Sequence, residues 1–166
     1  MVADRQVSIM SLTITASIIG AAITLVLIAY SDFKTRKIPN ILPLALTGLY
    51  GLYATASYIS GQMTITDITW SVGGAVIIFL VAALMFAYNI MGGGDVKALS
   101  ALALWAGKSY ILPLLFNVAI VGGVVALGLI ASRRFMRDSD LMNKVPYGVA
   151  IAVAGLILMK ILIILE

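Results

Sequence analysis

The sequence contains neither cysteine nor histidine, and only 11% of its 166 residues are charged. The absence of these two residue types excludes disulfides, Ser-His and Cys-His catalytic pairs, histidine or thiolate zinc sites, CxxC redox centres and c-type haem attachment. Soluble globular domains carry about 25% charged and about 45–50% apolar residues, whereas 62% of this chain is hydrophobic. The composition therefore indicates a membrane protein. We expect its chemistry to use acids, bases, hydroxyls and amides, with no metal and no organic cofactor.

Long apolar runs divide the chain. A helix needs about 20 apolar residues to cross the hydrocarbon core of a bilayer. Five runs reach this length and one does not: the full-length runs are 8–30, 40–59, 68–90, 109–132 and 146–165, and the short run is 96–107. At about 1.5 Å per residue the short run spans only part of the membrane. We predict an all-α polytopic membrane protein with six transmembrane helices, the fourth short, in a single domain over residues 1–166.

The distribution of positive charge predicts the orientation. Eight basic residues follow the first, third and fifth of the six predicted helices, the fifth being 109–132, and three lie elsewhere. The first group is Lys34, Arg36, Lys37, Lys97, Arg133, Arg134, Arg137 and Lys144, and the second is Arg5, Lys108 and Lys160. Cytoplasmic loops carry the excess of Lys and Arg, so we expect an inner (plasma) membrane protein with both termini outside. The membrane topology and the attraction of the lipid surface for positive charge account for these basic residues, so no nucleic-acid partner is expected.

Two of the seven acids differ from the rest. Asp32 lies in the segment SDFKTRKIPN and Asp95 in the segment GGGDVK, each at the cytoplasmic edge of an apolar run. The other five acids fall at the termini or in loops, where solvation explains them. A structural role is open for both: Asp95 can cap a helix that follows the glycines, and Asp32 can balance its basic neighbours. Because both lie at the same membrane face, and no other pair offers catalytic chemistry, we predict that they are the catalytic residues.

Two carboxylates that lie close together cannot easily both ionise. They can share one proton and activate a water molecule between them, one acting as base and the other as acid. A helix N-terminus at Asp95 stabilises its ionised form and favours this residue as the general base. The positively charged side chains of Lys34, Arg36 and Lys37 near Asp32 favour the reverse assignment. The roles within the pair therefore stay open, and the pair is expected to titrate as one unit.

Three segments carry a family resemblance: DFKTRKIPN, GGGDVKALSALALWAG and VPYGVAIAVAG, in this order. They resemble the type IV prepilin peptidases, which are membrane aspartyl proteases with a GxGD motif, and most closely the small TadV/CpaA-like branch associated with Flp-type pili. The resemblance implies that Asp32 and Asp95 are catalytic and that Gly92 and Gly94 are the motif glycines. It also implies that the substrates are prepilins or pseudopilins, whose basic leader, ending in Gly, is cut at the cytoplasmic face before a hydrophobic helix.

One departure from the larger members of that family affects the expected reaction. Those enzymes often carry a region with paired cysteines and N-methylate the new terminus, so this cysteine-free chain is expected to cleave without methylation. Lys97 is predicted to contact the substrate backbone or tune the pair, with a simple membrane anchor as the alternative. Pro146, Tyr147 and Gly148 begin the last run on the cytoplasmic side, where they either shape the wall of the site or only pack.

Other functions remain open at this stage. A transporter or channel would use the same two acids as ion or proton sites, and a structural partner in pilus assembly would need neither. A GxGD protease acting on other signal peptides or on preflagellins is the nearest enzymatic alternative. A Ser31–Lys34 dyad is disfavoured, because a lysine in a charged loop stays protonated and is a poor base.

Overall fold

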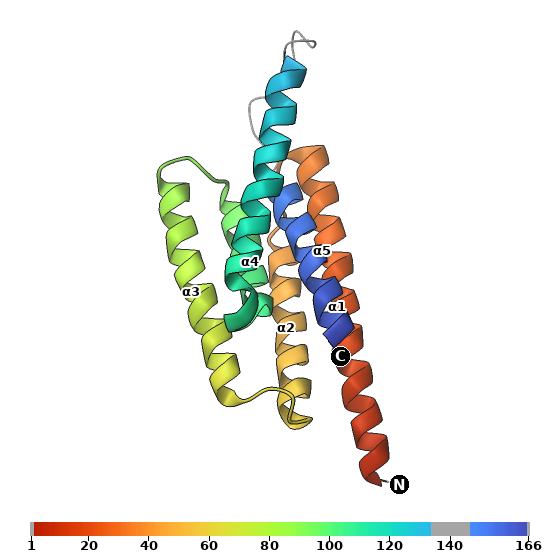
Figure 1. Cartoon of the computed structure of the whole chain (residues 1–166). Coiled ribbons are helices and arrows are strands. Elements are labelled where there is room, and N and C mark those ends of the chain that lie inside the picture. Colours follow the sequence, from red (N-terminus) through yellow and green to blue (C-terminus); the bar gives the residue numbers. More distant parts are fainter. Residues whose placement is uncertain (1, 134–146, 166) are drawn as a thin grey trace.

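The computed structural model describes residues 2–133 and 147–165, and these ranges contain five α-helices and no strand. The helices are α1 (Val2–Thr35), α2 (Ile41–Ile59), α3 (Ile65–Ala87), α4 (Gly93–Arg133) and α5 (Tyr147–Leu165). The all-α prediction is therefore confirmed for the described part of the chain. Figure 1 shows the helices as an elongated bundle, with α1 and the last part of α4 extending beyond it at opposite ends.

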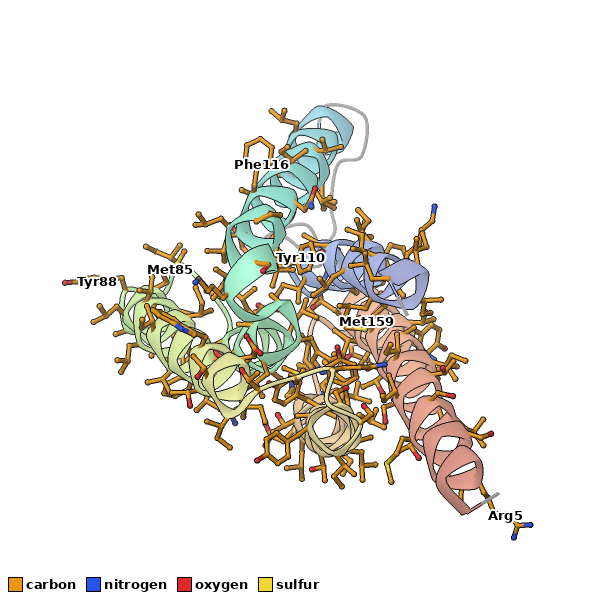
Figure 2. The ribbon with its side chains drawn as sticks, turned by 60° about the horizontal axis from the view of Figure 1, so that its bottom comes forward. Arg5, Met85, Tyr88, Tyr110, Phe116 and Met159 are labelled. Atoms are coloured by element: carbon orange, nitrogen blue, oxygen red, sulfur yellow. The ribbon has the colours of Figure 1, made fainter. Side chains whose placement is uncertain are left out.

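Four of the described segments are long and apolar enough to cross a membrane, which indicates a membrane protein. These segments are Ser8–Thr35, Ile65–Ala87, Gly93–Gly128 and Tyr147–Leu165. Their outer faces carry large apolar side chains, which in a bilayer contact lipid instead of water. Phe116, for example, is 68% exposed, and Figure 2 shows it pointing away from the bundle.

The prediction of six membrane-spanning helices is not supported for the described residues, in which four candidates are found. Helix α2 is not among the four candidates, because hydroxyl-bearing residues such as Thr47, Tyr50 and Thr55 dilute its apolar composition. The predicted short run and the run after it lie within one element, α4, and the boundary predicted between them coincides with an interruption at Gly107, with φ 51° and ψ −161°. Glycine adopts this positive φ without steric cost, and Figure 1 shows the chain reversing direction there. The start of the last run, Pro146, lies outside the described residues.

The helices pack around α1 and α4. Helix α1 contacts α2 and α5, whereas α4 contacts α2, α3 and α5. A Cβ atom at Gly155 of α5 would lie 2.8 Å from Leu25 Cδ1 of α1 and 2.9 Å from Leu102 Cδ2 of α4. Both leucines are fully buried, so a glycine here lets three helices approach closely, as small residues do in membrane proteins. This contact fixes α5 against both helices that carry the two acids.

Trp105 ties α4 to α2 in the core. It is 3% exposed, its Nε1–H donates to the Leu46 carbonyl oxygen at 3.1 Å, and its ring centroid lies 5.1 Å from that of Tyr53. We expect Trp105→Phe to lower the free energy of unfolding by about 1–3 kcal/mol, through the lost hydrogen bond and the cavity left behind. Denaturation in detergent micelles, followed by circular dichroism, measures this. The control is Trp70→Phe, at a 54% exposed position; equal losses in both variants would contradict the assignment.

Candidate active site

Asp32 lies in the last turn of α1 and is held by the first turn of α5. Its side chain is buried at 5% exposure. The N–H of Val149 donates to Asp32 Oδ2 at 3.2 Å, and the N–H of Gly148 donates to the same carboxylate. A Cβ atom at Gly148 would lie 2.8 Å from Cβ, Cγ and Oδ2 of Asp32. Amides at a helix N-terminus bind anionic groups well, so α5 positions the Asp32 carboxylate and offsets part of the cost of burying it.

Asp95 lies in the first turn of α4, and its two oxygens have different surroundings. The N–H of Gly92 donates to Asp95 Oδ2 at 3.3 Å, which satisfies one of the free amides at the start of the helix. Oδ1 is buried and has no hydrogen-bond partner among the described residues. Helix α4 begins at Gly93, so Asp95 is its third residue, whereas the sequence predicts that it caps a helix that follows the glycines. One of its oxygens accepts from Gly92 at the N-cap position, while the other is left for chemistry.

The remaining residues predicted for the site separate into two groups. A Cβ atom at Gly94 would lie 2.9 Å from Ile38 Cβ and 3.3 Å from the Ile38 carbonyl oxygen. Gly94 thus lets α4 begin directly against the segment that follows α1, and Gly92 lies beside Asp95. Lys97 is exposed, and its Nζ donates to Asn40 Oδ1 at 2.9 Å. It lines neither of the cavities that contain the acids.

Asp32 and Asp95 line the same two cavities, with volumes of about 530 Å³ and about 290 Å³. Gly92, Gly93 and Arg36 also line both, and Tyr147 lines the larger one. The ends of α1, α4 and α5 therefore bring two acids that are far apart in sequence to one space. The larger cavity is big enough for a water molecule and part of a peptide chain.

Arg36 is a residue whose place in the site the sequence does not reveal. It lies just after α1 with φ 54°, a conformation uncommon for a residue other than glycine. The turn is held by hydrogen bonds to the Lys37 carbonyl oxygen from Ser31 Oγ at 2.8 Å and from Thr35 Oγ1 at 3.3 Å. Arg36 Nε and Nη1 are buried and have no hydrogen-bond partner among the described residues. In the sequence this arginine is only one basic residue of a charged loop.

The same contacts weigh against a Ser31–Lys34 dyad. Ser31 Oγ is engaged by a main-chain carbonyl, and Lys34 Nζ donates to Tyr30 Oη at 3.3 Å. The two side chains are therefore turned to different partners. Across residues 2–133 and 147–165, no three acidic side chains gather as a metal site would require.

The sequence model of the type IV leader peptidase family matches residues 18–127, which is more than half of the 166-residue chain and includes both Asp32 and Asp95. No curated protein and no solved structure matches the chain. The matched range ends before α5, so the family match does not cover Gly148 or Val149. The contacts with Asp32 favour the first of the two predicted roles of Gly148, at the wall of the site, and they add Val149.

Proposed function

This chain belongs to the type IV leader peptidase family, and on that premise we propose that it is an aspartyl endopeptidase that removes the leader of prepilins and pseudopilins. Membership of this family implies a peptidase, hence a hydrolase. The observation that carries the aspartyl assignment is that Asp32 and Asp95 line the same two cavities. Within the family, the absence of cysteine favours the small branch that processes Flp-type precursors without methylating them.

The two acids are proposed to activate one water molecule placed between them. The ionised carboxylate takes a proton from the water as its oxygen attacks the scissile carbonyl carbon, and the protonated acid donates its proton to the carbonyl oxygen. The resulting diol collapses when the first acid protonates the leaving nitrogen and the second regains a proton from a hydroxyl. The C–N bond breaks, giving a carboxyl group and an amine, and both acids return to their starting forms. The unpartnered Asp95 Oδ1 fits either role.

The scissile segment is expected to lie extended across the site. A peptide bond inside a helix is already hydrogen-bonded and shielded, so it must unwind before water can attack it. A glycine at the cleavage position eases this unwinding. The apolar helix that follows would leave along a groove of about 580 Å³ lined by Leu44, Val76, Phe79 and Lys97. In this arrangement Lys97 contacts the precursor beyond the scissile bond and does not act on the acids.

The site is proposed to face the cytoplasm from the inner membrane. The end of α1 and the beginnings of α4 and α5 lie toward the same end of the bundle in Figure 1, away from the N-terminus. Exposed Lys34 lies in the last turn of α1 and exposed Lys37 follows that helix, whereas Lys108 follows the reversal at Gly107. This distribution agrees with the excess of basic residues on the cytoplasmic side of membrane proteins.

A defined precursor peptide tests the proposal. The purified protein in liposomes is incubated with a peptide that contains a basic leader, a glycine and an apolar helix, with and without S-adenosylmethionine. We expect mass spectrometry to find one cut after the glycine and no methylated product, and a peptide with a bulky residue replacing the glycine to be cut poorly. A methylated product would contradict the branch assignment. Absence of cleavage together with ion flux that depends on Asp32 and Asp95 would favour the transporter alternative.

A further inference from the structure

We propose that Arg36 is a substrate-binding residue, which donates hydrogen bonds to a main-chain carbonyl oxygen of the leader where the leader lies extended across the two acids. This inference rests on the proposed peptidase function. It adds a contact that the catalytic pair does not supply, namely a cationic donor inside the space where the peptide bond is placed.

The first observation is that donors and an acceptor are left unsatisfied in one place. Arg36 Nε and Nη1 and Asp95 Oδ1 are all buried without a hydrogen-bond partner among the described residues, and both residues line the same two cavities. Buried polar groups in native proteins are nearly always paired, because an unpaired one costs about 1–3 kcal/mol. A peptide group offers a carbonyl acceptor and an N–H donor, so an extended chain between Arg36 and Asp95 can satisfy both.

The second observation is that the position of Arg36 is fixed by its surroundings. A positive φ at a residue other than glycine persists only where neighbouring contacts impose it. Here the hydroxyls of Ser31 and Thr35 hold the next carbonyl oxygen, and the Arg36 N–H donates to the Asp32 carbonyl oxygen at 2.9 Å. The last turn of α1 therefore sets the arginine in the cavity with the acid that the same turn carries.

The charges of the site identify the kind of acceptor. An acidic side chain of the substrate would be repelled by Asp32 and Asp95, and a basic side chain would be repelled by Arg36. A neutral main-chain carbonyl meets neither penalty, and it is present at every residue of an extended leader. The guanidinium carries five N–H donors and no acceptor, so a hydrogen bond to this carbonyl is charge-assisted and stronger than a neutral one.

Steady-state kinetics on the precursor peptide test this role. We expect Arg36→Gln to raise KM about 10- to 100-fold, the size expected for losing a charged hydrogen bond, with a much smaller change in kcat. Arg36→Lys keeps the charge and one donor and should recover part of the loss. The matched control is Lys34→Gln, because Lys34 lies in the last turn of the same helix but lines neither cavity; its KM should equal that of the wild type.

Two outcomes overturn the proposal. An unchanged KM in Arg36→Gln would mean that water alone satisfies the guanidinium, and a fall in kcat at unchanged KM would mean that the arginine acts on the acids. A binding measurement separates failure of the proposed Arg36 contact from failure of the proposed peptidase function. In the Asp95→Asn background, Arg36→Gln should raise the Kd for the uncleaved peptide by the same factor. Because this measurement needs no cleavage, it tests the contact even if the wild type cleaves the peptide poorly. Unchanged peptide binding in that background rejects the contact.

Discussion

Replacing either acid by its amide is expected to abolish precursor cleavage. We expect Asp32→Asn and Asp95→Asn each to lower kcat at least about 10³-fold, because each removes a group that must take up and release a proton, and acid–base catalysis contributes about 10²–10⁴-fold per group. The double variant should be no slower than the slower single variant, since groups that act as a unit are not additive. Initial rates of peptide cleavage in liposomes measure all three.

The amide variants keep the shape of the acids, so they test chemistry more than folding. In Asp95→Asn, the amide oxygen can still accept from the Gly92 N–H that Asp95 Oδ2 now binds at 3.3 Å. Asp32→Asn can keep one acceptor for the Val149 N–H. The control is Asp67→Asn, an exposed acid in the first turn of α3 that lines neither cavity. A single variant at Asp32 or Asp95 that keeps more than about a tenth of the wild-type rate would exclude the shared-proton mechanism.

The sequence predicts the two candidate acids by residue number, and it predicts the path of the chain through the membrane less well. Asp32 and Asp95 are identified by the absence of other catalytic residues and by their matching positions at the ends of apolar runs, and the structure places both at the same cavities. The membrane class follows from composition alone, and four spanning-capable helices support it. The catalytic roles of Asp32 and Asp95 stay a prediction until the variants described above are measured.

The path of the chain depends on single residues whose effect hydropathy does not show. Hydropathy ends the short run at Gly107, but it does not show that the positive φ of this one glycine makes the turn. In the sequence, Arg36 looks like an ordinary basic loop residue. The hydroxyls of Ser31 and Thr35 turn it toward the acids by binding the carbonyl oxygen of the next residue, Lys37, and the sequence does not show these contacts. Gly148 contacts a residue more than a hundred positions away, and no spacing rule connects the two. In each case the missing information is a tertiary contact.

Gly148→Ala is expected to produce the next largest loss of activity. The new methyl group would lie 2.8 Å from Cβ, Cγ and Oδ2 of Asp32, closer than carbon and oxygen atoms can pack. Asp32 is buried and its Cβ is fixed on α1, so the first turn of α5 must withdraw and weaken the 3.2 Å bond from Val149 to the carboxylate. We expect kcat to fall about 10- to 100-fold, because misplacing a catalytic group by about 1 Å costs about 10²-fold.

Stability measured beside activity separates this effect from simple misfolding. Alanine is a better helix former than glycine by about 1 kcal/mol, which offsets part of the overlap, so the free energy of unfolding should change much less than the rate. Gly123→Ala in α4 is the matched control, because a Cβ there meets nothing within 4 Å and activity should be unchanged. Gly148→Val should lower kcat further than Gly148→Ala. If Gly148→Ala cleaves at the wild-type rate, then the N-terminus of α5 does not set the Asp32 carboxylate, and another element must hold it.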